Sequence, residues 1–268
     1  MERRFDWGHQ TVVMGILNVT PDSFSDGGHY NQLEAAVVRA REMLAAGATI
    51  IDVGGESTRP GHTPVGEEEE LARVIPIIQA LKKELNCEIS IDTYKSNVAE
   101  AAIQAGATII NDIWGGIEDP RILDVARDYQ VPIILMHNRK LPEYPNGFNV
   151  DYLKDIEEMI TQAKKTGIKE EQIWLDPGIG FAKNLEQNIQ AMQLLPKLVA
   201  YGYPVLLGTS RKSLIGGILD IPVEERLAGS LATVSYGVMQ GVSIVRVHDV
   251  RETVDTVRVL KHLMKEER

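Results

Sequence analysis

Polar and charged side chains recur at the ends of short apolar runs along this chain. The residues in these places are Asn18, Arg59, Asp92, Asn111, His137, Asp176, Lys212, Arg246 and His248. One set supplies acceptor oxygens that suit a flat heterocycle rich in N–H groups, namely Asp92, Asn111 and Asp176. A second set supplies donors or positive charge for phosphate oxygens, namely Asn18, Arg59, Arg246 and His248. Together they predict a pocket for a heterocycle that carries a phosphate or a diphosphate.

Each of these residues also has an ordinary structural interpretation. Asp92 and Asn111 could cap the helices that follow them, and Asp176 could begin a turn at Pro177. Arginine and lysine are usually surface charges, and a single histidine is more often structural than catalytic. The interpretation as a site therefore depends on whether the fold brings the set together.

Motifs for a metal centre or a catalytic nucleophile are weak. The oxygens of Asn18 with Asp22 or Asp92 could hold Mg²⁺ through a bound diphosphate, but they are too few to hold the ion alone. A Ser–His–Asp triad has no elbow motif to support it. Mg²⁺ is therefore the one cofactor that we expect.

Composition excludes several classes of function. The net charge of −10 over 268 residues disfavours binding to nucleic acid or to an anionic membrane. The single Cys87 excludes an internal disulfide and fits a reducing cytosol. Arg3 and Arg4 precede an apolar stretch that ends without a cleavage site, so we expect no secretion signal. No run approaches the roughly 18 apolar residues of a membrane span, and a cytoplasmic location is expected.

The elements that must position these residues alternate regularly. Short apolar runs predict strands at residues 12–17, 49–53, 88–92, 108–111, 132–136, 172–175, 204–208 and 243–247. Helical spacing predicts helices at residues 33–46, 67–85, 96–105, 120–129, 150–165, 184–201 and 224–240, and a last helix that ends near residue 265. Ser96 is expected to cap the third helix.

Eight strand–helix units without a linker predict an α/β fold, a (β/α)₈ TIM barrel that forms a single domain over residues 1–268. In such a barrel every strand ends at the same rim, so the polar residues described above would meet there. The competing interpretation is an open, doubly wound sheet. It is disfavoured because the glycines at 178 and 180 lack the third glycine of a dinucleotide-binding turn.

Segments at all the strand ends resemble one family, the bacterial dihydropteroate synthases, over nearly the whole length of the chain. Residues 138–149 are the segment that does not match. The matching segments are MGILNVTPDSFSDGG, DVGGESTRPG, SIDTYK, INDIWGG, LMH, DPGIGF, GTSRKS and RVHDV.

The resemblance implies a (β/α)₈ barrel that forms a homodimer. The implied reaction joins 6-hydroxymethyl-7,8-dihydropterin diphosphate to 4-aminobenzoate, which gives 7,8-dihydropteroate for folate biosynthesis and releases diphosphate with Mg²⁺ as cofactor. It also implies that sulfonamides, which resemble 4-aminobenzoate, act on the enzyme.

The resemblance further assigns roles to particular residues. Catalytic roles fall on Asp92, Lys212, Arg246 and Asn18, with Asn18 also a metal ligand. The pterin would contact Asp92, Asn111, Asp176 and Lys212. The diphosphate would contact Asn18, Arg59, Arg246 and His248. The aminobenzoate would lie among Phe24, Ser25, Thr58, Arg59, Pro60, Lys212 and Ser213.

Two other functions remain open from the sequence. A pterin-binding barrel that presents methyltetrahydrofolate to a corrinoid partner would share the Asp and Asn acceptors. It would not need Arg59, Arg246 and His248 for a diphosphate. A binding barrel without catalysis is the third possibility. Diphosphate binding on its own would separate these from the synthase.

Overall fold

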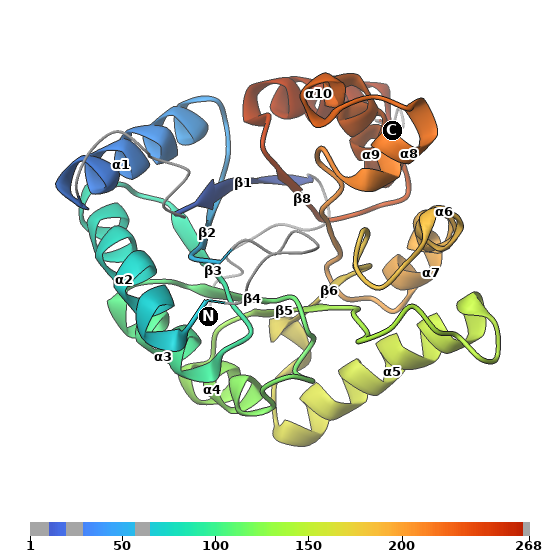
Figure 1. Ribbon diagram of the computed structural model, residues 1–268, viewed down its shortest axis with the longest axis horizontal. Helices are drawn as coiled ribbons and strands as arrows, with labels where there is room; N and C mark the ends of the chain where they lie inside the picture. The colour runs from blue at the N-terminus through green and yellow to red at the C-terminus, as the bar shows by residue number, and fades with distance from the viewer. Residues whose placement is uncertain (1–10, 20–28, 57–64, 265–268) are drawn as a thin grey trace.

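A computed structural model shows a barrel of eight parallel strands with helices around its outside (Figure 1). It describes residues 11–19, 29–56 and 65–264. The strands run in the order β6-β5-β4-β3-β2-β1-β8-β7. A bridge between Leu175 and Val205 joins β6 to β7 and closes the ring. The strands are β1 Val12–Asn18, β2 Ile50–Gly54, β3 Glu88–Asp92, β4 Ile109–Asp112, β5 Ile133–Met136, β6 Ile173–Asp176, β7 Leu206–Leu207 and β8 Ile244–Val247.

The helices cover the outer face of the sheet (Figure 1). Short 3₁₀ turns lie at Glu170–Gln172 and Val223–Glu225. Within the described ranges, no helix is long and apolar enough to cross a membrane. The helices are α1 His29–Ala45, α2 Glu67–Glu84, α3 Ser96–Ala105, α4 Arg121–Tyr129, α5 Phe148–Thr166, α6 Leu185–Gln193, α7 Leu195–Ala200, α8 Ser213–Leu219, α9 Leu227–Met239 and α10 Val250–Leu263.

The predicted barrel is confirmed, and the doubly wound alternative is wrong, because β1 pairs with both β2 and β8. Some local predictions were also wrong. The helix expected at 184–201 is two helices, with Pro196 in the first turn of the second, where its missing N–H costs least. Helix α8 was not predicted. Ser96 is not a cap, because it is the first residue of α3 and Lys95 holds the cap position; the backbone N–H of Ser96 donates to Asp119 Oδ2 at 2.8 Å.

Strand alternation and register place two kinds of layer inside the barrel. One layer is apolar and includes Met14 and Ile50, which are paired in register. Side chains two residues further along a strand point to the same face. That spacing turns Asp52 of β2 inward above Ile50, in register with Ser90 of β3. The barrel therefore carries an apolar floor beneath a polar layer at the carboxyl ends of its strands.

Close packing between α9 and β7 provides a test of this arrangement. A Cβ added at Gly237 would lie 2.4 Å from Leu207 Cδ2. We expect Gly237→Ala to lower the free energy of unfolding by about 1–3 kcal/mol, because an overpacked core must shift. Gly66→Ala is the control, since its Cβ would meet nothing within 4 Å and its φ of −62° suits any residue. Urea unfolding measures the free energy of unfolding of both variants. Equal midpoints for Gly237→Ala and the parent chain would contradict this packing.

Candidate active site

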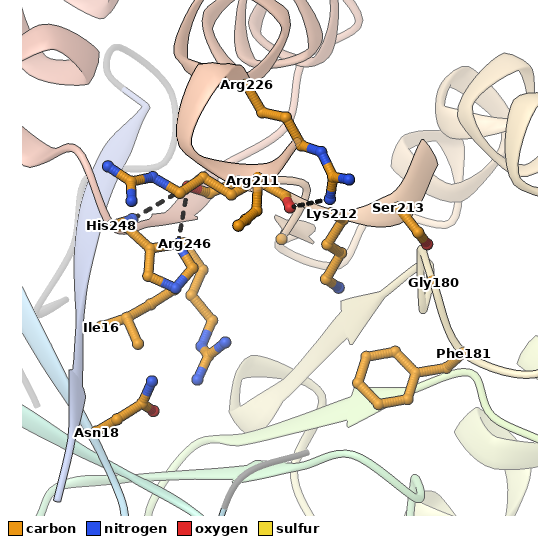
Figure 2. Close-up of a pocket in the computed structure, with 13 residues that line it drawn as sticks. Ile16, Asn18, Gly180, Phe181, Arg211, Lys212, Ser213, Arg226, Arg246 and His248 are labelled. Carbon is orange, nitrogen blue, oxygen red and sulfur yellow. Dashed lines mark hydrogen bonds between the residues drawn. The ribbon is translucent and has the colours of Figure 1, made fainter. Parts of the chain in front are cut away.

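A cavity of about 340 Å³ opens at the carboxyl ends of the strands. Asn18, Arg246 and His248 lie along one side of it, and Lys212 and Phe181 lie across from them (Figure 2). Five of the residues predicted from the sequence therefore line one space, namely Asn18, Lys212, Ser213, Arg246 and His248. Phe24, Ser25, Thr58, Arg59 and Pro60 lie outside the described residues.

The three predicted heterocycle contacts are buried at the carboxyl ends of their strands and are not among the residues that line the cavity. Asp92, Asn111 and Asp176 expose 6%, 3% and 4% of their surface. Within the part of the chain that the structure describes, Asp92 Oδ1 and Asn111 Oδ1 have no hydrogen-bond partner. A buried acceptor without a partner costs about 1–3 kcal/mol, so such atoms point to a ligand. The ligand that suits them brings N–H donors.

Asp52 orients one of these groups, Asn111, from below. It is fully buried, and the amide nitrogen of Asn111 lies 3.4 and 3.3 Å from its two carboxylate oxygens. Because that amide donates to Asp52, its oxygen is left for another donor. Asp52 was not among the predicted site residues. A signal for it was present in the sequence, since a carboxylate interrupts the otherwise apolar strand at 49–53.

Arg246 joins the two halves of the site. Its Nε donates to Asp52 Oδ2 and its Nη2 donates to Asp92 Oδ2, both at 2.6 Å. Burial acts against the charge of Arg246, but the carboxylates of Asp52 and Asp92 hold its pKa above the ordinary value. The resemblance placed Arg246 among the catalytic and the diphosphate-binding residues, whereas the structure shows two of its N–H groups bound to carboxylates. Its contact with a diphosphate stays a prediction.

Burial shifts the pKa values of the facing charges. It raises the pKa of Asp92 to about 7, with repulsion from Asp52 adding to the shift and Arg246 opposing it. Burial also raises the pKa of Asp176, although Lys212 opposes the rise. It lowers the pKa of Lys212 to about 8, against the attraction of Asp176. Lys212 lines the cavity, and the two carboxylates lie beside the lining residues Arg246 and Gly208. Clusters of shifted groups of this kind are typical of active sites.

Lys212 and Asp176 lie on either side of a small residue. A Cβ added at Gly208 would be 3.7 Å from Lys212 Nζ and 3.9 Å from Asp176 Oδ2. Asp176 Oδ1 accepts the backbone N–H of Gly178 at 2.7 Å. Lys212 Nζ donates to the carbonyl of Ile179 at 2.5 Å. The absence of a side chain at Gly208 therefore leaves room beside a carboxylate and an ammonium.

Two further basic side chains reach the cavity without having been predicted. Arg211 pairs with Asp249, where Nε lies 2.9 Å from Oδ2, and Arg226 Nη1 donates to the carbonyl of Arg211 (Figure 2). Nδ1 of His248 lies 3.0 Å from Ser210 Oγ. These bonds fix the wall that carries His248. The arginines resemble ordinary surface charges in the sequence, so no local pattern reveals them.

The described residues contain no group of three or more His, Cys, Asp or Glu side chains placed to hold a metal ion. His137, the remaining strand-end residue, lies away from the cavity lining and is fully buried. Its Nε2 is 2.9 Å from Asp155 Oδ2, and its Nδ1 is 2.9 Å from Lys183 Nζ. His137 is therefore part of the support beneath the site.

Comparison with known proteins agrees with this geometry. The profile of the pterin binding enzyme family matches residues 14–248. The chain belongs to the pterin-binding enzymes, among the dihydropteroate synthases. A dihydropteroate synthase of Clostridium beijerinckii is 55% identical over 251 residues, which cover 93% of each chain.

Solved structures of similar enzymes extend the match. The dihydropteroate synthase of Clostridium difficile, crystallised in the presence of pteroic acid, superposes with a TM-score of 0.94 at 48% identity, covering 98% of this chain and 100% of that one. The Xanthomonas albilineans enzyme with 4-aminobenzoic acid superposes with a TM-score of 0.91 at 41% sequence identity. The match covers 96% of this chain and 94% of that one. The Yersinia pestis enzyme with a sulfonamide drug superposes with a TM-score of 0.87 at 42% sequence identity. The match covers 97% of this chain and 95% of that one.

The charge of Asp92 provides a test of the site in this pterin-binding enzyme. Only the ionised carboxylate can both accept ligand N–H groups and pair with Arg246. We therefore expect affinity for a pterin without diphosphate to rise about tenfold between pH 6 and pH 8, following the pKa of about 7. Calorimetry measures it. Asp92→Asn is the control and should bind weakly at every pH. An equally steep rise in that variant would assign the titration to another group.

The raised pKa of Asp92 also makes the stability of the folded protein depend on pH. The folded protein keeps a proton on Asp92 that the unfolded chain loses above its ordinary value of 3.8. The stability that this proton contributes is complete below pH 3.8 and declines as the pH rises to about 7. Stability and ligand affinity thus respond to the ionisation of Asp92 in opposite directions.

Proposed function

We propose that this chain joins 6-hydroxymethyl-7,8-dihydropterin diphosphate to 4-aminobenzoate and releases diphosphate, the dihydropteroate synthase step of folate biosynthesis. The observation that carries the proposal is the pair of unpartnered buried acceptors on Asp92 and Asn111 beside the cation of Arg246. A pterin ring supplies the N–H donors that these oxygens lack. The match to dihydropteroate synthases over nearly the whole chain supports the same reaction.

The chemistry follows from the charges around the ring. Breaking the C–O bond to the diphosphate leaves positive charge on the pterin methylene, which the ring shares. The carboxylate of Asp92 stabilises that charge in a site largely closed to water. The aminobenzoate nitrogen then forms the new C–N bond with its lone pair and loses one proton. The amine needs no strong base, because the carbon that it attacks is already electron-poor.

The diphosphate side rests on the cavity wall formed by Asn18, Arg246 and His248. Asn18 offers one neutral amide oxygen, a suitable ligand for Mg²⁺ that takes its other ligands from diphosphate oxygens and water. When bound, Mg²⁺ would neutralise charge on the leaving diphosphate. The N–H donors of His248 and Arg246 orient the diphosphate. Arg59 completes the set in the proposal and lies outside the described residues.

The aminobenzoate is proposed to lie against Lys212, Ser213 and Phe181, which line the cavity together. The ammonium of Lys212 suits the carboxylate of aminobenzoate, and the ring of Phe181 suits its aromatic face. Sulfonamides share the aniline ring and a polar para group, so they would occupy this pocket. The complex of the Yersinia pestis enzyme with a sulfonamide drug supports this.

We further propose that the chain works as a cytoplasmic homodimer. Exposed apolar side chains on α8 and α9, Ile218, Leu219 and Met239, leave 57%, 50% and 53% of their surface uncovered. Exposed apolar side chains of this kind favour burial against a second copy. The single Cys87 supports a reducing compartment. Light scattering in solution measures the oligomeric state.

One assay tests the reaction directly. Diphosphate release should require both dihydropterin diphosphate and 4-aminobenzoate, and Asp176→Asn should lower pterin affinity by about 2–4 kcal/mol. An amide at this position would place its N–H groups against those of the pterin. Asp128→Asn is the control, because that carboxylate lies on the exposed surface of α4. Diphosphate release without aminobenzoate, or full pterin affinity in Asp176→Asn, would contradict the proposal.

A second arm of the assay tests the metal. Chelation of divalent ions should abolish tight binding of inorganic diphosphate, measured by calorimetry, while leaving the binding of a pterin without diphosphate unchanged. Asn18→Ala should weaken the metal-dependent diphosphate binding and spare the pterin. Equal diphosphate affinity with and without Mg²⁺ would contradict a role of the ion in diphosphate binding.

A further inference from the structure

The segment that follows β6 forms a wall of the cavity in a conformation that must be held in place. Gly180 and Phe181 line the cavity, and Gly178 and Gly180 have φ values of 67° and 87°. Ala182 has a φ of 43°, which an L residue rarely adopts. A turn with this backbone needs partners outside itself to keep its shape.

Lys183 supplies two of those partners from one atom, while Asn188 and Lys212 bind the backbone of Gly180 and Ile179. Its Nζ lies 2.9 Å from the carbonyl oxygen of Gly178, 3.0 Å from that of Phe181 and 2.9 Å from Nδ1 of His137. An ammonium group has three N–H donors. Three acceptors lie within 3.0 Å of this nitrogen, and the carbonyl oxygen of His137 is a fourth at 3.4 Å. Lys183 therefore ties both ends of the turn to the end of β5.

The acceptor on β5 is rigidly held. His137 is fully buried, and burial lowers its pKa to about 4, so the ring is neutral near pH 7. Its Nε2 donates to Asp155 Oδ2, which leaves Nδ1 to accept from Lys183. Asp155 is fixed in turn by two bonds from Arg139, at 2.6 and 2.9 Å. The anchor therefore extends from the turn into α5 and into residues 138–149, the segment without a match in the sequence.

The turn transmits this anchoring to the two residues proposed to contact aminobenzoate. The carbonyl of Ile179 accepts from Lys212 Nζ at 2.5 Å, and the same nitrogen lies 4.8 Å from the centre of the Phe181 ring. Ile179 and Phe181 both lie within the span that Lys183 clamps. Lys183 does not line the cavity itself.

We propose that Lys183 is a positioning residue for the aminobenzoate half of the site, acting through the turn of residues 178–181 on Lys212 and Phe181. The inference rests on the proposed function. The pterin half depends less on Lys183, because two of its proposed contacts, Asp92 and Asn111, are held by Arg246 and Asp52 from other strands and not by the turn. Loss of the clamp should therefore affect the two substrates unequally.

The test is steady-state kinetics of Lys183→Met, which keeps an unbranched side chain and removes all three donors. The KM for 4-aminobenzoate should rise about tenfold, and the inhibition constant of a sulfonamide should rise with it. The dissociation constant of the dihydropterin diphosphate should change less than threefold. Asp155→Asn disturbs the far end of the same anchor, so it should raise the KM for aminobenzoate in the same direction by about threefold.

Gln172→Met is the matched control. Gln172 is also buried and also ties backbone carbonyls, those of Ala126 and Val131, but at the opposite end of β6. Gln172→Met should lower the unfolding temperature without changing the KM for 4-aminobenzoate or the dissociation constant of the dihydropterin diphosphate. A role of Lys183 in stability alone would give the same pattern in Lys183→Met and would overturn the inference.

The remaining outcomes are also decisive. Equal increases for both substrates in Lys183→Met would overturn the inference, because the clamp would then serve the whole site. If Lys183→Met does not fold, Asp155→Asn decides, and an unchanged KM for aminobenzoate in that variant would overturn the inference. If the parent chain itself releases no diphosphate, the proposed function fails, and this inference fails with it.

Discussion

The buried guanidinium of Arg246 is the interaction on which the rest of the site depends. It bridges Asp52 and Asp92 at 2.6 Å each, and these residues stand 194 and 154 positions away along the chain. Charges removed from water are costly unless they are paired and hydrogen-bonded. The two carboxylates therefore fix the position of the Arg246 guanidinium, and the guanidinium fixes the positions of the carboxylates. Through Asp52 the constraint reaches Asn111, so the acceptors offered to a pterin are set before it binds.

The barrel makes that bridge possible. Pairing of β8 with β1, of β1 with β2 and of β2 with β3 puts the strands that carry Arg246, Asp52 and Asp92 in one continuous part of the barrel. Alternation along each strand turns every second residue inward, above an apolar floor that excludes water from below. Polar groups concentrate at the open rim, where the cavity lies. The same scaffold that stabilises the chain therefore orients its charges.

Much of this was predictable from the sequence, because a residue at a strand end has its place fixed by topology. Asn18, Asp92, Asn111 and Asp176 were predicted in this way, and the structure places all four at the rim. Asp52 was missed because a single carboxylate inside an apolar strand gives no sign of its partner. Lys183 was missed because it stands just before Asn184, the cap of α6, and resembles an ordinary surface charge in the sequence. Pairing between distant residues depends on register, which no local pattern encodes.

The most direct test of the account is the affinity of Asp52→Asn for a pterin without diphosphate, measured by calorimetry at pH 8. Asp52 is fully buried beneath the rim, so the variant acts through the orientation of Arg246 and Asn111. We expect at least a tenfold loss of affinity, because the amide would present an N–H to groups that are themselves donors. The unfolding temperature confirms that the variant is folded under the same conditions. Unchanged affinity in a folded Asp52→Asn protein would show that the bridge does not organise the site.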